Sequence, residues 1–312
     1  MSHHTAHSLI PGADLLGFSI NLATATGPTD VVQRFGWLDT SKGQQQQRGH
    51  QAYFVPDAVD VTDKGTMSTT ASAFASLTEC RHHLARKAGV EASERGGSSW
   101  AAAVYSRLAP GEAGTVYGLV EDESIVWNTA LKPGQPLRLA PGVNAAMQAL
   151  PTSFAAATQA ALFHFLDSYG THFITAAQVG GLLRYAAVVR GAAGYSPTAA
   201  RTQLGLEYDG VFARSASAGK AYWEAMNKNW LPSRTANLSV SGGNAAILSF
   251  ATPPHDAADL VNYHGAVQNW RMGLLARPGI VGTRLLPLSG LAPAAVAPAL
   301  EAAIRAYLAG PG

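Results

Sequence analysis

The residues that could do chemistry in this 312-residue chain do not come in catalytic combinations. Cys80, the only cysteine, stands beside Arg81, His82 and His83 in a stretch that we expect to be helical, and adjacency in sequence does not make a Cys–His dyad. No G-x-S-x-G motif is present, and SASAGKAY lacks the hydroxyl residue that a phosphate loop needs after Lys220. We therefore predict that the protein is not an enzyme and has no catalytic residue.

Metal, cofactor and nucleic-acid sites are not predicted either. His3, His4 and His7 lie in a tag-like N-terminal tail, for which disorder is a simpler interpretation than metal binding. The formal net charge is only +2, so the chain carries no electrostatic footprint for a nucleic-acid partner. With a single cysteine there is no disulfide framework, and the fold must rely on its core.

The composition is poor in charge. Charged residues make up 13% of the chain, about half the usual share, and apolar residues make up 47%. The polar surface must then consist of Ser, Thr, Asn, Gln and Gly, which suits a protein that later meets lipid or another copy of itself. A compositional bias towards Ala explains the same numbers. The chain has no apolar run of about 18 residues and a poor secretory signal, so we expect a protein that is soluble as made.

The expected elements describe one α+β domain with a long antiparallel sheet. Strands are predicted at 12–22, 52–62 (interrupted at Pro56), 115–131, 171–191 and 235–243, helices at 70–89, 153–170 and 256–275, and a polar loop at 43–51. Ser153 is a plausible N-cap of the second helix, and Gly170 ends it. Steps of four through Val296, Leu300, Ile304 and Leu308 predict an amphipathic helix in the C-terminal tail.

One stretch is more specific than the rest. Tyr-Gly-Thr-His-Phe occupies 169–173, and after six further residues come Gly180 and Gly181. The stretch contains no nucleophile with a base, no metal-ligand spacing and no phosphate loop. It indicates a mechanical role rather than a catalytic one.

These seven positions resemble the signature of the membrane-attack-complex/perforin (MACPF) and cholesterol-dependent cytolysin superfamily. The flanks are similar too: 153–173 resembles the helix leading into the motif, LSVSGGN (238–244) the turn after the second helical cluster, and 277–291 the closing strand and helix. The resemblance implies an α+β fold with a bent, twisted four-stranded antiparallel sheet flanked by two helical clusters. It covers residues 10–291, between a flexible tail (1–9) and a C-terminal amphipathic helix (292–312), and leaves no separate targeting domain.

The resemblance also assigns structural roles to these residues. Gly180 and Gly181 would form a hinge, because a bent sheet needs strand positions without a Cβ. The rest of the motif would pack at that hinge and hold the bend; its residues are Tyr169, Gly170, Thr171, His172 and Phe173. Gly242 and Gly243 would form the turn that follows the second cluster.

Both clusters can be located between predicted strands. The second falls at 192–234, where alternation makes Leu204, Leu206, Tyr208 and Phe212 the candidate lipid-facing residues of a membrane strand. A pair of surface helices with chance alternation is the other interpretation. The first cluster is expected between Gly89 and Thr115, roughly 25 residues, which leaves little more than two membrane strands of about 9 to 11 residues each. It would then make a minimal hairpin or would not span a membrane.

Two functions remain. The first is a pore-forming protein that is secreted or released, binds a target membrane, assembles with itself into a ring or arc, and inserts β-hairpins from both clusters. The second is a non-lytic MACPF module that binds a membrane or a protein. In either case targeting must come from the body of the chain, from the tail helix, or from a separate targeting protein.

Overall fold

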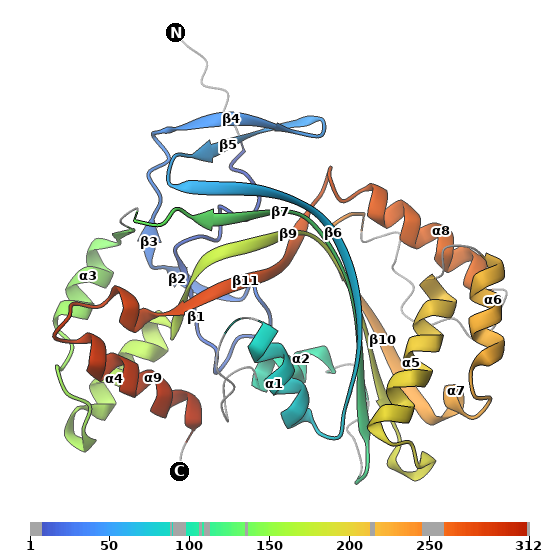
Figure 1. The fold of residues 1–312 in the computed structure, drawn as a ribbon. Coiled ribbons are helices and arrows are strands. Elements are labelled where there is room, and N and C mark those ends of the chain that lie inside the picture. Colours follow the sequence, from blue (N-terminus) through green and yellow to red (C-terminus); the bar gives the residue numbers. More distant parts are fainter. Residues whose placement is uncertain are drawn as a thin grey trace.

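The computed structural model of the protein describes residues 8–87, 89, 98–105, 108, 113–134, 137–212, 216–244 and 259–310. Its centre is a seven-stranded sheet in which β2, β1, β9, β7 and β6 follow one another and both β10 and β11 pair with β9. Figure 1 shows that this sheet is strongly bent. The expected α+β class and antiparallel sheet are confirmed.

Three long strands form the body of the sheet: β6 (Val59–Phe74), β7 (Val116–Leu131) and β9 (His172–Val189). They contain 16, 16 and 18 residues, so each is about 50–60 Å long. Val, Tyr, Ile and Thr recur along β7 and β9, as expected for strands buried against other elements. The predicted strands at 115–131 and 171–191 are these two.

The fourth long line of the sheet consists of two strands placed end to end along β9. β10 (Arg234–Ser241) pairs with the half of β9 from Val189 to Leu182. β11 (Gly279–Pro287) pairs with the other half, from Gly180 to His172. β1 (Phe18–Ile20) and β2 (Val31–Arg34) extend the sheet beside the start of β9.

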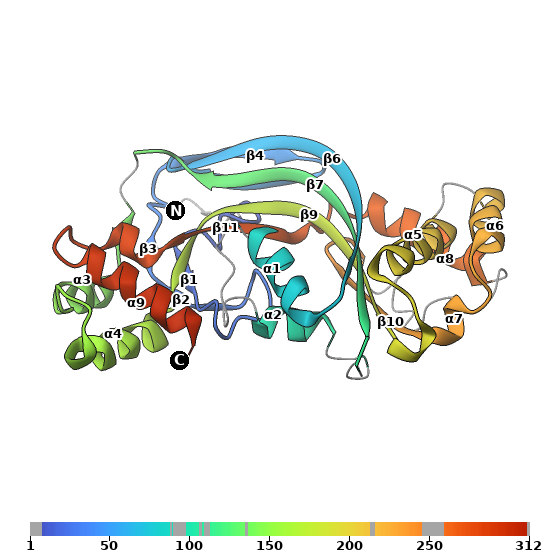
Figure 2. The ribbon, with the colours of Figure 1, turned by 60° about the horizontal axis from the view of Figure 1, so that its bottom comes forward.

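Helices cover both faces of the bent sheet. Between β6 and β7 lie α1 (Leu77–Lys87) and α2 (Ser98–Val104), and between β9 and β10 lie η1 (Gly191–Ala193), α5 (Pro197–Phe212), α6 (Ala216–Ala225) and α7 (Trp230–Ser233). We name these two insertions the first and the second cluster. α8 (Asp259–Met272) separates β10 from β11. In Figures 1 and 2, α1 and α2 lie inside the curve of the sheet, and α5 to α8 lie on its outer face.

The remaining elements gather around the other half of the sheet. A helical group, α3 (Pro141–Gln148), α4 (Ala156–Tyr169) and α9 (Ala297–Ala309), lies at one end together with η3 (Leu288–Leu291). Leu300, Ile304 and Leu308 of α9 are buried. Two small ladders complete the fold: β3 (Gly36–Trp37) with β8 (Arg138–Leu139), and β4 (Gly43–Arg48) with β5 (Gln51–Pro56).

Two hydrophobic cores lie on opposite faces of the sheet. Alternate residues of β7 contribute to each: Leu119 packs into the core that contains Cys80 and Leu84 of α1, and Val120 packs into the core that contains Leu204 of α5. Each cluster is therefore attached to the sheet by its own core.

Several local predictions were wrong. The expected polar loop at 43–51 is the β4–β5 hairpin, in which a glutamine run pairs with the apolar strand Tyr53 to Val55. The helix predicted from residue 70 begins at Leu77, because residues 70–74 continue β6 and pair with β7. Ser153 is not the N-cap of α4; the N-cap is Ala155, whose backbone N–H donates to Oγ1 of Thr158 at 2.9 Å.

The same correction changes the size of the first cluster. It occupies residues 75–115, since α1 belongs to it rather than preceding it. The second cluster occupies residues 190–233. The expectation that the first cluster is confined to roughly 25 residues is wrong, and each insertion is long enough for two membrane strands of about 9 to 11 residues and a turn.

Candidate functional site

The bend coincides with a row of register irregularities in three strands of the sheet, β6, β7 and β11. The register shifts between Asp63 and Thr66 in β6, where Gly65 has a φ of +56°. It shifts again between Ile125 and Trp127 in β7, and between Ile280 and Gly282 in β11. Extra residues of this kind bend a strand and increase its twist, so together they bend the whole sheet at one level.

Gly180 and Gly181 of β9 lie at the level of this row. Other atoms approach both residues so closely that neither position has room for a Cβ. A Cβ on Gly180 would lie 1.9 Å from the carbonyl oxygen of Ser124 in β7. A Cβ on Gly181 would lie 2.4 Å from Leu274 and 2.7 Å from the Trp270 ring. The glycine pair therefore admits the neighbouring strand on one side and the end of α8 on the other.

Gly242 lies directly against Gly180, and Gly243 lies against Trp270 of α8. Both have positive φ values, +77° and +63°, as a tight turn after β10 requires. A Cβ on Gly242 would lie 2.2 Å from the carbonyl oxygen of Gly180. Nε1 of the buried Trp270 donates to the carbonyl oxygen of Gly242 at 2.8 Å, so one indole ring covers both glycine pairs.

The Tyr-Gly-Thr-His-Phe segment does not pack at this hinge, and the expectation that it holds the bend there is corrected. It lies at the start of β9, where His172 pairs with Ile20 and Pro287, and Phe173 with Ser19 and Leu286. Seven residues of extended strand separate Phe173 from Gly181, which corresponds to roughly 25 Å. Both segments lie on the same extended strand, so the side chains of the motif cannot reach the glycine pair.

The motif instead fixes the beginning of β9. Gly170 has a φ of +86° and ends α4. The Thr171 hydroxyl accepts from the backbone N–H of Leu22 at 3.1 Å and donates to the carbonyl oxygen of Ile20 at 3.3 Å. Tyr169 stacks on Phe165 with ring centroids 4.7 Å apart. The Thr171 contacts tie the start of β9 to β1 and the residues after it, directly after the end of α4.

His172 is buried beside Thr171, with Nδ1 3.0 Å from the threonine hydroxyl. Burial lowers the pKa of His172 to about 4, although the charge of Glu301 acts in the opposite direction. The imidazole is therefore neutral in the folded protein at pH 7 and at mildly acid pH.

We predict that the free energy of unfolding falls as the pH drops from about 6.5 to about 4, by up to about 3 kcal/mol. The unfolded chain binds a proton at His172 near pH 6.5, whereas the folded protein binds it only near pH 4. Urea unfolding at several pH values measures the slope. His172→Gln should remove this part of the pH dependence, and an unchanged slope in the variant would contradict the assignment.

The second cluster packs on the outer face of the sheet through the candidate lipid-facing residues. Leu204 and Tyr208 of α5 are buried, Leu206 is half-buried, and Phe212 is the last residue of the helix. Gly118 of β7 provides a hole for Leu204, because a Cβ there would lie 2.8 Å from Cδ2 of the leucine. In the folded protein Leu204 and Tyr208, four residues apart, share one face of α5, and Leu206 lies on another.

Buried carboxylates, which sequence reasoning missed, connect this cluster to the sheet. Asp122 of β7 accepts a hydrogen bond of 2.6 Å from the Tyr208 hydroxyl and forms an ion pair with Arg271 of α8. Burial, together with the charge of Asp122, raises the pKa of Tyr208, so the phenol remains a donor. One strand residue thus holds both α5 and α8.

Glu207 of α5 forms a second connection and is completely buried. Its carboxylate accepts from the Tyr185 hydroxyl of β9 at 2.5 Å and from Nε1 of Trp230 of α7 at 2.7 Å. It also forms an ion pair with Arg234, the first residue of β10. Glu207 therefore joins α5 to two strands and a second helix at the end of the sheet from which the cluster emerges.

Glu121, next to Asp122 on β7, faces the first cluster. Its carboxylate contacts Lys87 of α1 at 2.6 Å, Arg184 of β9 at 2.9 Å and His83 at 3.6 Å. Burial opposes ionisation, but the hydrogen bond to His83 and the charges of Arg184 and Lys87 outweigh it, so the pKa of Glu121 lies well below its ordinary value. Neighbouring carboxylates on one strand thus hold the two clusters on opposite faces. The sequence signal was a run of acids, Glu121 to Glu123, inside an apolar strand.

The chemistry of the site is that of packing and ion pairing. Within the described ranges, no group of three His, Cys, Asp or Glu side chains is arranged to hold a metal ion. None of the helices in those ranges has the length and apolar character needed to cross a bilayer. The fold and the site together define a protein built around a bent sheet that carries two helical insertions, one on each face.

The family follows from comparison with known proteins. The MAC/Perforin domain model matches residues 20–310, so the chain belongs to this family. The family consists generally of non-enzymatic pore formers that bind membranes, oligomerise and act there. No curated protein sequence matches the chain.

Solved structures agree with the fold. GNIP1Aa from Chromobacterium piscinae superposes with a TM-score of 0.72 at 14% identity, over 96% of this chain and 56% of that one. A putative cell invasion protein with a MAC/Perforin domain from Bacteroides thetaiotaomicron gives 0.57 at 10% identity, over 95% and 61%. The chain thus spans little more than half the length of the first two relatives.

Proposed function

We propose that this protein forms pores: it assembles on a membrane, opens its sheet at the bend, and converts both clusters into transmembrane β-hairpins. One observation carries the proposal. Each cluster connects the adjacent ends of two strands that are already paired, with Phe74 opposite Tyr117 and Val189 opposite Arg234. Each insertion would therefore extend an existing antiparallel hairpin without changing its register.

The two hairpins would also grow side by side. Val116, the first residue of β7, pairs with Val189, the last residue of β9, so both clusters leave the same end of the sheet. Extension would give four adjacent strands, and closure of such strands from many copies into a barrel would satisfy every backbone hydrogen bond in lipid. In the extended form Leu204, Leu206, Tyr208 and Phe212 would share one face and meet the acyl chains.

Assembly requires free strand edges at both sides of the sheet. Among the residues that the structure describes, β6 pairs only with β7, and β10 only with β9. Residues 62–70, in the middle of β6, are exposed to solvent, and β6 is paired along one edge with β7. Unpaired edges are templates for another strand, so β6 of one copy and the β10–β11 line of the next are the surfaces that we propose meet in a ring or arc.

A non-lytic assembly is the second candidate, and the charge of α1 favours it. If residues 77–87 became a strand, one face would carry Glu79, Arg81 and Lys87, and the other His82 and Arg86. An Arg or Lys on the lipid face costs about 2–4 kcal/mol at the bilayer midplane. Under this alternative the protein would bind a membrane or a partner, assemble, and leave the bilayer intact.

Release of a trapped dye from liposomes decides between the two functions. We expect the purified protein to release dye from liposomes of at least one lipid extract. Ring or arc assemblies should be visible on the same vesicles by electron microscopy. Assemblies without dye release would favour the non-lytic function. If no extract gives assemblies and no extract gives dye release, the proposal is contradicted for the protein acting alone.

A further inference from the structure

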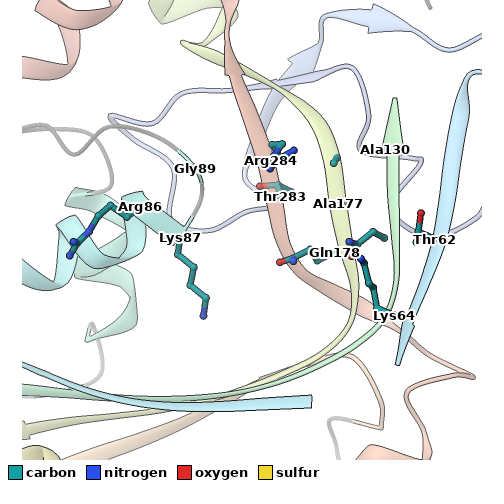
Figure 3. Close-up of a pocket in the computed structure, with 12 residues that line it drawn as sticks. Thr62, Lys64, Arg86, Lys87, Gly89, Ala130, Ala177, Gln178, Thr283 and Arg284 are labelled. Atoms are coloured by element: carbon teal, nitrogen blue, oxygen red, sulfur yellow. The ribbon is translucent and has the colours of Figure 1, made fainter. Parts of the chain in front are cut away.

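A cavity of about 500 Å³ lies between the end of α1 and the inner face of the sheet, on the side of the bend away from the second cluster (Figure 3). α1 contributes Arg86 and Lys87 to its wall, β6 contributes Lys64, and β11 contributes Arg284. Pockets of this size hold small molecules in many proteins.

The charge of the lining is entirely positive: four side chains are Lys or Arg, and none is Asp or Glu. Lys87 is already paired with Glu121 and Glu123. The head of Arg86 points away from the strands in Figure 3, and its Nε donates to the carbonyl oxygen of His82. Lys64 and Arg284 are exposed, and no acidic partner is recorded for either within the described part of the chain. These two cations flank the strands of the pocket floor.

The floor of the pocket offers a side-chain amide with an unpaired atom. Asn128 of β7 pairs in register with Gln178 of β9, so their amides lie side by side on the inner face. Oδ1 of Asn128 is buried and lacks a hydrogen-bond partner. Buried polar atoms are normally paired, so an orphan amide facing a cavity indicates a polar ligand.

Gly282 leaves room for the Gln178 side chain in the pocket floor. A Cβ on Gly282 would lie 2.8 Å from Oε1 of Gln178. The register shift between Ile280 and Gly282 places that glycine opposite the glutamine. The Gln178 side chain extends towards α1 in Figure 3.

We propose that this pocket binds a small phosphate-bearing anion, with Lys64 and Arg284 neutralising its charge and the NH2 groups of the Asn128 and Gln178 amides donating to its oxygens. Cationic donors make the stronger hydrogen bonds to phosphate oxygens. The anion is either a free phosphate ester or the phosphate of a lipid headgroup, since both present the same chemistry.

The position of the pocket gives such a ligand a further effect, which rests on the proposed function. Because the cavity lies between α1 and strands β6, β7, β9 and β11, a bound anion would attract the end of the first cluster to the sheet. A ligand that binds only this arrangement stabilises it. A free anion would thus delay release of the first cluster.

Calorimetric titration of the full chain with pyrophosphate tests the site. We expect binding to the natural protein and to a control with two exposed cations removed elsewhere, Lys220→Gln with Arg305→Gln. Lys64→Gln with Arg284→Gln should weaken binding about tenfold per charge, roughly 100-fold together. A charge-preserving variant, Lys64→Arg with Arg284→Lys, should retain binding and shows that loss is not caused by misfolding.

Sedimentation with phosphatidylcholine vesicles, with and without phosphatidylglycerol, distinguishes the two sources. Pyrophosphate binding that depends on Lys64 and Arg284 supports a free anion; vesicle binding with the same dependence supports a headgroup. The proposal is overturned if neither probe binds, or if the pocket variant and the control lose binding equally. Dye release is measured separately, so a failed anion site would leave the pore function standing.

Discussion

Replacing Glu207 with alanine is expected to lower the free energy of unfolding by about 3–5 kcal/mol, the cost of removing one partner from a buried ion pair. The substitution leaves Arg234, whose side chain is 10% exposed, without its counter-charge. It also leaves the Tyr185 hydroxyl and Nε1 of Trp230 without their acceptor. Each orphaned donor adds to the loss, because all of them remain buried. Typical domains are stable by only about 5–15 kcal/mol, so the change is large.

Urea unfolding followed by tryptophan fluorescence measures this loss, since Trp230 reports on the affected contact. Glu224→Ala is the matched control: it lies on α6 of the same cluster, its side chain is 66% exposed, and it pairs with Lys220 in the i,i+4 arrangement. Its cost should stay within about 0.5 kcal/mol. A loss below about 1 kcal/mol for Glu207→Ala would mean that the buried carboxylate does not hold the second cluster.

The kinetic consequence follows if the pore function holds. Glu207 connects α5 to β9, α7 and β10, so its removal weakens attachment of the cluster without touching the hinge glycines. Glu207→Gln, which keeps an acceptor but no charge, should fall between the natural protein and Glu207→Ala in stability. Dye release should be slowest for the natural protein, intermediate for Glu207→Gln and fastest for Glu207→Ala.

The sequence predicted the part of the fold that lies near its motif. The strands at 115–131 and 171–191 and the antiparallel sheet follow from alternation and from the signature at 169–181. The start of the first cluster was missed because Ala71 to Phe74 have a helical composition but pair with β7. The β4–β5 hairpin was missed because a run of glutamines gives no strand signal by itself.

The candidate site was predicted only in part. Gly180 and Gly181 were singled out, but the sequence does not show that their neighbours are the Ser124 carbonyl and the Trp270 ring. The buried carboxylates depend on pairs that are distant along the chain, such as Asp122 with Arg271. In a membrane strand with Leu206 and Tyr208 facing lipid, Glu207 between them would face the polar side, whereas the helix buries it completely. Glu207 can be buried in a helix and also face the polar side of a strand only if the segment adopts a helix in one state and a strand in another.

Changing Gly180 and Gly181 together to valine is expected to prevent folding of the sheet or its opening. At position 180 the new Cβ would lie 1.9 Å from the Ser124 carbonyl oxygen, a backbone atom held by the β7 ladder. No rotamer relieves such a contact, so β7 and β9 must separate, at a cost of at least about 4 kcal/mol. At position 181 the neighbours are the side chains of Trp270 in α8 and of Leu274 just after that helix, and the smaller cost of overpacking, about 1–3 kcal/mol, applies.

Comparing the single variants separates folding from opening. Gly181→Val should fold and displace α8 from the bend, and Gly180→Val should lose most of the folded protein. Gly142→Val is the matched control, because a Cβ there meets nothing within 4 Å. Circular dichroism and thermal unfolding measure the fold, and dye release measures the pore. A folded Gly180→Val, Gly181→Val protein that released dye at the natural rate would show that the sheet does not open at these glycines.

If the double variant folds and binds membranes but releases no dye, the hinge itself is responsible. The bend is made by bulges in β6, β7 and β11 as well as by β9, so flattening the sheet must remove register shifts in several strands at once. The glycine pair is the only point in that row, within the described residues, at which both a strand carbonyl and a helix side chain approach within 3 Å of a would-be Cβ. Opening must therefore move α8 and Trp270 off Gly181 before β7 and β9 can straighten, so Gly181→Val, which weakens that contact, should release dye faster than the natural protein.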